Sequence, residues 1–149
     1  MKIVVQRVKS ASCRVNFEVT SKINNGFLLF TGFTHTDTLA EVEYFAKKVA
    51  NLRVFEDEEG KMNKSITAMG YEILNISQFT LYGDARKGNR PSFTEAMEPV
   101  RAEELYLELT NILNKTYNIK TYNGVFGENM DIELINDGPV TIMLGGKEK

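Results

Sequence analysis

The chain has 149 residues, of which 42% are hydrophobic and 26% are charged, and its formal net charge is −2. This composition is typical of one globular domain with a substantial core. Because the net charge is slightly negative, any binding of nucleic acid must come from a local positive patch and not from the charge of the whole chain. No apolar run approaches the roughly 20 residues of a membrane-spanning helix, and the N-terminus resembles a strand rather than a signal peptide. Because Cys13 is the single cysteine, no intrachain disulfide can form, and we expect a cytoplasmic protein.

Alternating and continuous apolar runs predict strands in the first part of the chain. The predicted strands are residues 2–8, 12–17, 19–23 and 27–33. A helix is predicted to begin at Thr38, since Thr38 and Glu41 match a capping box and apolar residues continue at helical spacing to Leu52. A short strand at 53–55 and an acidic turn at 56–60 follow.

The second half combines strands with one long helix. Residues 61–70 show no regular pattern, and 71–78 form a predicted strand. A helix is predicted over 99–115, with Pro99 in its first turn. Strands at 119–122, 130–135 and 140–144 follow, the last two as a hairpin, and 145–149 are an expected frayed tail. Without a linker, and with strands outnumbering the two main helices, the pattern predicts a single α+β domain over 1–149.

The turn between the last two predicted strands is the least ordinary stretch. Asn136, Asp137 and Gly138 each favour a tight turn. Pro139 then fixes its own φ and removes an amide donor. A hairpin does not need this proline, so the stretch predicts a rigid corner whose carbonyls face solvent or a ligand. The local sequence favours a trans Gly-Pro bond, because only about 5–6% of X–Pro bonds are cis.

The usual catalytic and metal-binding motifs are missing. One histidine, His35, cannot form a multi-histidine metal site, and the acidic run 56–59 is better explained as a solvated turn. The stretch 77–80 ends a predicted strand, where free backbone N–H groups could form an oxyanion hole. Ser77 or Thr80 could instead be a nucleophile, although no base lies nearby in the sequence. The simpler alternative is a strand end whose hydroxyls bond their own backbone.

A basic loop follows that strand end. Arg86, Lys87 and Arg90 lie within five residues, with Tyr82 and Phe93 on either side. Such a loop could bind phosphates and stack on a base. It could equally be a solubilising surface loop.

Seven segments together resemble the D-aminoacyl-tRNA deacylase family, in its bacterial D-tyrosyl-tRNA deacylase form, along essentially the whole chain. They are residues 5–8, 51–57, 60–63, 77–81, 86–93, 126–130 and 136–141. The most specific pair is Ser77-Gln78-Phe79-Thr80 followed by Asn136-Asp137-Gly138-Pro139-Val140-Thr141. Some positions depart from the commoner family pattern. They are the stretches 30–33 and 16–22, together with Val125, Glu128 and Asn129.

The resemblance implies a homodimeric editing enzyme without metal or organic cofactor. Its substrate would be aminoacyl-tRNA, with hydrolysis of the ester between a D-amino acid, or glycine, and the 3′-terminal adenosine. The expected fold has antiparallel or mixed sheets that form a barrel-like core, with two main helices outside. The resemblance also implies a cis bond between Gly138 and Pro139, which would enter the partner's active site and exclude L side chains by overlap.

The same resemblance assigns roles to further residues. Ser77, Gln78, Phe79 and Thr80 would line the pocket floor, with backbone amides around Phe79 holding the ester carbonyl. Arg7 would brace the Gly-Pro corner, and Phe126 and Met130 would lie near the terminal adenosine. The resemblance further implies that catalysis relies on the substrate's own ribose 2′-hydroxyl. Two alternatives stay open: an esterase with Thr80 as nucleophile, and a non-catalytic RNA-binding dimer.

Overall fold

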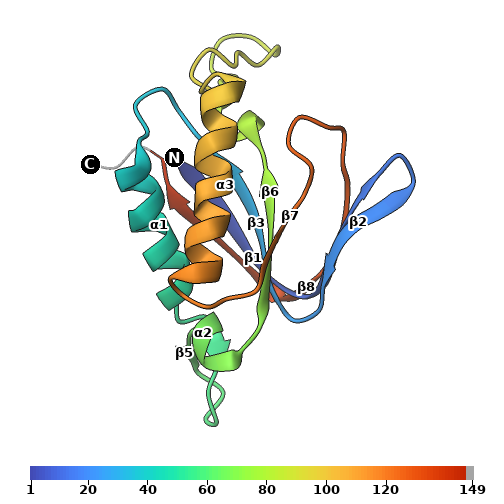
Figure 1. The fold of residues 1–149 in the computed structure, drawn as a ribbon, viewed down its shortest axis with the longest axis vertical. Helices are drawn as coiled ribbons and strands as arrows, with labels where there is room; N and C mark the ends of the chain where they lie inside the picture. The colour runs from blue at the N-terminus through green and yellow to red at the C-terminus, as the bar shows by residue number, and fades with distance from the viewer. Residues whose placement is uncertain (147–149) are drawn as a thin grey trace.

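The long N-terminal strand is the centre of the fold. In the computed structural model, which describes residues 1–146, β1 (Lys2–Val15) pairs antiparallel with three other strands. These are β2 (Glu18–Ile23), β3 (Gly26–Gly32) and β8 (Asp131–Gly145). Beyond β3, the parallel strands β6 (Glu72–Ser77) and β7 (Thr121–Asn123) extend the sheet. The mixed sheet curls until it is nearly closed into a barrel (Figure 1), which confirms the predicted α+β class.

Two helices cover the outside of the sheet (Figure 1). The first, α1 (Leu39–Asn51), has the predicted Thr38–Glu41 capping box, and α3 (Pro99–Lys115) begins at the predicted proline. Their buried side chains pack with alternate residues of β1 and β3 into the larger of two cores. No helix within residues 1–146 has the length and apolarity needed to cross a membrane.

Several short elements escaped sequence analysis. The stretch 61–70 was expected to be irregular, but it contains β5 (Met62–Lys64), which pairs with β4 (Phe55–Glu56), and the single-turn helix α2 (Ile66–Met69). The 3₁₀ turn η1 (Phe79–Tyr82) follows β6. Each is too short to show a hydrophobic period. The two strands expected at 2–8 and 12–17 are one continuous β1, because pairing with β8 carries it across the polar residues between them.

The C-terminal hairpin expected from the sequence does not form, so that prediction is wrong. Its two arms do not pair with each other, because both pair with β1 as parts of the single strand β8. Asn136 lies opposite Val8 and Thr141 lies opposite Gln6, so residues 137–140 face the single residue Arg7. The predicted corner is therefore a bulge within a long strand. The expected tail overlaps the end of β8, and its residues 147–149 lie outside the described part of the chain.

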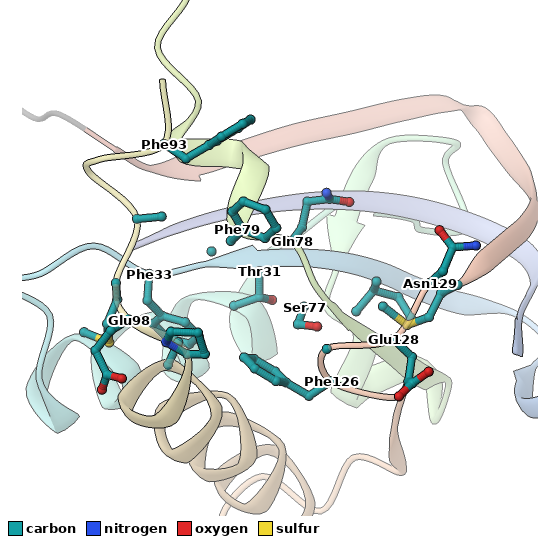
Figure 2. A pocket seen from close by; sticks show the side chains of 18 of the residues that line it. Thr31, Phe33, Ser77, Gln78, Phe79, Phe93, Glu98, Phe126, Glu128 and Asn129 are labelled. Carbon is teal, nitrogen blue, oxygen red and sulfur yellow. The ribbon is translucent and has the colours of Figure 1, made fainter. Parts of the chain in front are cut away.

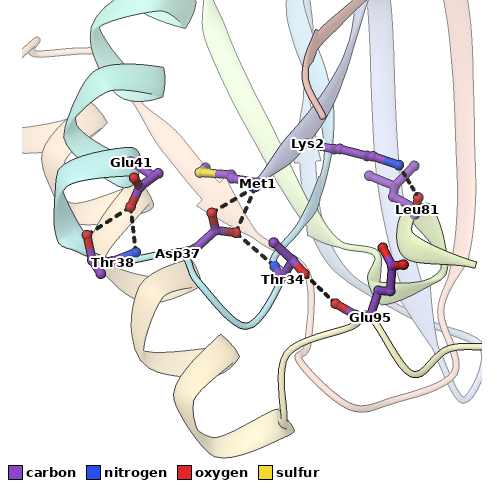
Figure 3. A network of polar contacts seen from close by, with 8 residues as sticks. All are labelled: Met1, Lys2, Thr34, Asp37, Thr38, Glu41, Leu81 and Glu95. Atoms are coloured by element: carbon purple, nitrogen blue, oxygen red, sulfur yellow. Dashed lines mark hydrogen bonds and ion pairs between the residues drawn. The ribbon is translucent and has the colours of Figure 1, made fainter. Parts of the chain in front are cut away.

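The start of β1 holds two loops, residues 34–37 and 79–82, through polar contacts (Figure 3). The N-terminal ammonium of Met1 lies 2.7 Å from a carboxylate oxygen of Asp37, and both groups are buried. Asp37 also accepts a hydrogen bond from the Thr34 N–H, at 2.8 Å. On the other side, the Lys2 ammonium donates to the Leu81 carbonyl oxygen at 3.1 Å. Residues 34–37 and 79–82 are thus both held to the start of β1.

A buried polar network connects the sheet to α3. The side chain of Asn75, which is 0% exposed, accepts from the Thr31 hydroxyl at 2.8 Å and donates to Thr110 at 3.0 Å. The Tyr106 hydroxyl donates to the Asn75 carbonyl oxygen at 2.6 Å and accepts from the Gly124 N–H at 3.1 Å. Burial raises the pKa of Tyr106 above its ordinary value of 10.0, so its hydroxyl stays a neutral donor.

This network predicts a loss of stability in alkali. The unfolded state loses the Tyr106 proton near pH 10 while the folded state keeps it, so the free energy of unfolding is unaffected below about pH 10 and falls as the pH rises above it. Tyr106→Phe should cost about 1 kcal/mol at neutral pH, through the lost hydrogen bond. It should also flatten the alkaline decline measured by urea unfolding.

The control is Tyr44→Phe, since Tyr44 is exposed on α1. It should leave the alkaline decline unchanged. Some decline should remain in Tyr106→Phe, because burial also raises the pKa of Tyr82. An identical decline in Tyr106→Phe and the unaltered protein would contradict the prediction.

Candidate functional site

A cleft of about 660 Å³ opens where β3 and β6 end (Figure 2). Thr31 and Ser77, neighbours in the parallel pairing of these strands, form its floor. Its walls come from the segment after β6, the segment leading into α3 and the loop between β7 and β8. The main wall residues are Gln78, Phe79, Phe93, Met97, Glu98, Phe126, Glu128, Asn129 and Met130.

The chain leaves β6 in a way that frees two backbone donors beside the cleft floor. The Gln78 N–H still follows the sheet and donates to the Thr31 carbonyl oxygen at 2.8 Å. The next two residues, Phe79 and Thr80, begin η1, and within residues 1–146 their N–H groups have no acceptor. Backbone donors of this kind stabilise an oxyanion that develops on an ester carbonyl.

The hydroxyl groups near these donors lack an activating base. Ser77 lines the cleft, whereas Thr80 is exposed and accepts a hydrogen bond from the Gln78 side-chain amide. His35 is bound to the Thr94 carbonyl oxygen at 2.7 Å, outside the cleft. The Glu98 carboxylate caps α3 by accepting from two backbone N–H groups. In the described part of the chain, no carboxylate or imidazole contacts either hydroxyl.

The loop between β7 and β8 forms the wall that carries Phe126 and Met130. It is held from behind, because the Gly124 N–H donates to the Tyr106 hydroxyl at 3.1 Å and the Phe126 ring lies 5.7 Å from the Tyr106 ring. A Cβ atom at Gly124 would lie 2.7 Å from the Met130 sulfur and 2.8 Å from Ile76. Only glycine permits this close approach, which packs Met130 into the wall.

An exposed aromatic pair and the basic loop lie at the opposite rim. The rings of Phe79 and Phe93 meet edge to face at 5.2 Å. Within the loop, the Arg86 guanidinium binds both oxygens of Asp84 and lowers the pKa of that carboxyl to about 2. Lys87 and Arg90 are exposed, and neither forms an ion pair within residues 1–146. The base of the loop, where Asp84 pairs with Ser92, directly precedes Phe93 of the cleft wall, and the loop carries these two unneutralised cations.

The Gly138–Pro139 corner lies outside this cleft. Both residues are exposed and neither lines it, and the same holds for Arg7, which is buried under the corner. The Gly138–Pro139 bond is cis. The local base rate for X–Pro bonds therefore predicted the wrong isomer, whereas the family resemblance predicted the observed one.

Arg7 and Asn136 hold the corner in place. Arg7, which is 6% exposed, donates to the Asp137 carbonyl oxygen at 2.8 Å and to the Val54 carbonyl oxygen at 2.7 Å. The Asn136 side chain accepts from the Val140 N–H at 2.8 Å and donates to the Val140 carbonyl oxygen at 3.2 Å. Backbone groups on both sides of Gly138 and Pro139 are thereby satisfied without a neighbouring strand.

The acidic run 56–59, which the sequence analysis considered as a metal site, forms hydrogen bonds and an ion pair near its own turn. Among residues 1–146, no three His, Cys, Asp or Glu side chains gather as metal ligands would. In the acidic turn, Asp57 accepts from the N–H groups of Glu59 and Lys61, and Glu58 pairs with Lys64. Sequence reasoning missed Thr31, Met97 and Glu98 of the cleft, since only the pairing of β3 with β6 and the position of α3 bring them together.

Comparisons with known proteins find the same family over nearly the whole chain. The family model described as D-Tyr-tRNA(Tyr) deacylase matches residues 4–145. A D-aminoacyl-tRNA deacylase of Geobacillus sp. (strain WCH70) is 50% identical, over 100% of this chain and 97% of the relative. One of Brevibacillus brevis is 52% identical, over 97% of this chain and 99% of the relative.

Two solved structures are also similar. One, named c-Myc DNA Unwinding Element Binding Protein, has a TM-score of 0.93 and 45% identity, covering 99% of this chain and 100% of that one. A probable eukaryotic D-amino acid tRNA deacylase has a TM-score of 0.83, covering 96% of this chain and 97% of that one. Because it is only 15% identical, it shows likeness of fold alone.

The bonding of Arg7 predicts a large effect on stability. Arg7→Met keeps most of the side-chain volume but leaves the Asp137 and Val54 carbonyls without their donor, so we expect a loss of about 2–4 kcal/mol in urea unfolding. Arg7→Lys should lose less, although one ammonium cannot reproduce the planar fork of a guanidinium.

The matched control is Arg14→Met on the same strand. Arg14 pairs with Glu133 at the surface, at 3.3 Å, so this variant should change the free energy of unfolding by about 1 kcal/mol or less. Equal effects at Arg7 and Arg14 would show that the buried guanidinium does not hold the corner.

Proposed function

This chain belongs to the D-Tyr-tRNA(Tyr) deacylase family, and on that premise we propose that it is a D-aminoacyl-tRNA deacylase. It hydrolyses the ester between a D-amino acid and the 3′-terminal adenosine of tRNA, and so returns free tRNA to translation in the cytoplasm. The observation that carries this proposal is a cleft with free backbone donors beside its floor and, among residues 1–146, no base on either neighbouring hydroxyl. Such a site suits a substrate that brings its own catalytic group.

The cleft supplies binding and electrostatic stabilisation. The ester carbonyl oxygen accepts from the N–H groups at Phe79 and Thr80, with Ser77 and Gln78 beside it. The adenine packs against Phe126 and Met130. Water adds to the carbonyl carbon, the bond to the ribose 3′-oxygen breaks, and that oxygen takes a proton. The ribose 2′-hydroxyl, adjacent to the ester, assists this proton movement in place of a protein base.

The Gly138–Pro139 corner supplies the selectivity for D-amino acids, and it does so in a homodimer. It projects from β8, a strand that within residues 1–146 pairs only with β1 and exposes Ile135 and Met143. We infer that this surface meets a second copy and that Gly138 and Pro139 enter the partner's cleft. Their carbonyls bind the substrate's ammonium group, and their rigid backbone overlaps an L side chain. Exclusion by overlap tolerates many D-amino acids, and it does not exclude glycine, which has no side chain.

The decisive experiment compares D-Tyr-tRNA and L-Tyr-tRNA, each with an intact or a 2′-deoxy terminal adenosine. Release of tyrosine should be rapid from the intact D-ester only, with Gly-tRNA also cleaved. Equal cleavage of the 2′-deoxy D-ester would show that the protein supplies its own base or nucleophile. Equal cleavage of both enantiomers would contradict the role of the corner.

Two alternative functions make different predictions. An esterase with Thr80 as nucleophile would form a covalent acyl-enzyme and lose activity in Thr80→Ala, whereas the proposed mechanism retains appreciable activity in that variant. A non-catalytic RNA-binding dimer would bind tRNA through Lys87 and Arg90 in a salt-sensitive way, without turnover. No observation favours either alternative over the proposed deacylase.

The corner also predicts a change of specificity. A Cβ atom at Gly138 would lie 2.7 Å from the Val140 nitrogen, and φ there is +149°, so Gly138→Ala must displace the corner. We expect the preference for D-Tyr-tRNA over L-Tyr-tRNA, measured as a ratio of kcat/KM, to fall by about tenfold or more. Gly70→Ala is the control, since Gly70 also has a positive φ but a Cβ there meets no atom within 4 Å. It should keep the full preference.

A further inference from the structure

The tip of the hairpin between β1 and β2 is strained and exposed. Asn16 and Phe17 form its two-residue turn, with φ values of 51° and 69°. Hairpin turns of this kind favour glycine at the second position, because a bulky side chain is unfavourable at positive φ. Phe17 is nevertheless 94% exposed, the most exposed of the large hydrophobic residues described. Packing within the chain therefore does not explain a phenylalanine here.

The hairpin that carries this tip begins next to the wall of the functional cleft. Arg14 pairs with Asp131 at the start of β8, directly after Asn129 and Met130 of the cleft wall. Phe17 is three residues beyond Arg14, or about 10 Å at roughly 3.3 Å per residue. Figure 1 shows the hairpin leaving the sheet where the loop between β7 and β8 enters β8.

The hairpin also carries positive charge. A second cleft, of about 310 Å³, runs between it and β8, and its lining includes Arg14, Lys22 and Glu133. Arg14 is paired with Glu133, whereas Lys22 is exposed and forms no ion pair within residues 1–146. Among the described residues Lys22 is therefore the free cation of this groove, and an exposed aromatic ring with a cation on the same hairpin can stack on a base and contact a backbone phosphate.

We propose that Phe17 stacks on an unpaired base of the RNA 3′ end, just upstream of the terminal adenosine held in the cleft. The inference rests on the proposed function, since it takes the substrate to be an aminoacyl-tRNA. Bases in single-stranded ends are recognised largely by stacking on aromatic side chains. The strained tip holds the ring in solvent on a hairpin that begins at the cleft wall, and Lys22 lies on the same hairpin for the backbone phosphates.

The test is binding of fluorescein-labelled uncharged tRNA, either intact or lacking its three 3′-terminal nucleotides. Phe17→Gly should weaken binding of intact tRNA by about fivefold or more and leave binding of the truncated tRNA unchanged. Phe17→Trp should bind intact tRNA at least as well as the unaltered protein. Tyr44→Ala, which removes an exposed aromatic ring on α1, is the control and should have no effect.

Phe17→Gly also distinguishes a loss of RNA affinity from a loss of folding stability. Glycine relieves the positive φ, so the Tm should rise while the affinity falls. Equal affinity for intact tRNA in Phe17→Gly and the unaltered protein would overturn the proposal. A smaller mass in analytical ultracentrifugation would overturn it too, by showing that Phe17 contacts a second copy of the chain.

Hydrolysis of D-aminoacyl-adenosine by the unaltered protein tests the deacylase activity without the rest of the tRNA. If it is absent while Phe17→Gly still loses tRNA affinity, the deacylase proposal fails and the stacking contact stands. If hydrolysis is present while Phe17→Gly binds tRNA normally, only the stacking proposal fails.

Discussion

The bonding of one buried arginine decides the most unusual part of this fold. Residues 137–140 of β8 face Arg7 alone across the sheet, so their backbone groups cannot all find partners on β1. The Arg7 guanidinium supplies the donor for the Asp137 carbonyl while it also binds the Val54 carbonyl, and the Asn136 side chain bonds both backbone groups of Val140. Its planar fork suits two acceptors in fixed directions better than an ammonium would. The corner is therefore a built feature of the sheet rather than a loose loop.

A second constraint holds the cleft open in one shape. The network around Asn75 joins Thr31 at the cleft floor to Tyr106 on α3, and Tyr106 in turn holds the loop that carries Phe126. Floor and wall thus share one set of buried hydrogen bonds. A fully satisfied network of this kind favours a single arrangement of the groups around it.

The chemistry proposed for this site follows from what the cleft provides. In the described part of the chain its hydroxyl groups contact no base, and its free donors are backbone N–H groups. A polypeptide with this inventory can orient an ester and stabilise its charge, and the ribose of the substrate completes the reaction. The corner lies apart from the cleft on the same chain, and the proposed dimer brings the two together.

The sequence by itself determined the two main helices, the buried strand β3 and the family. The capping box at Thr38, the apolar period of α3 and the buried run of β3 were readable because each depends on neighbouring residues only. Three residues of the motif at 77–80, namely Ser77, Gln78 and Phe79, line the cleft. Only the tertiary structure decided that the two C-terminal arms form one strand on β1, and that Thr31, Met97 and Glu98 join the cleft. These features depend on pairing between segments far apart in the chain, which no local period or propensity encodes.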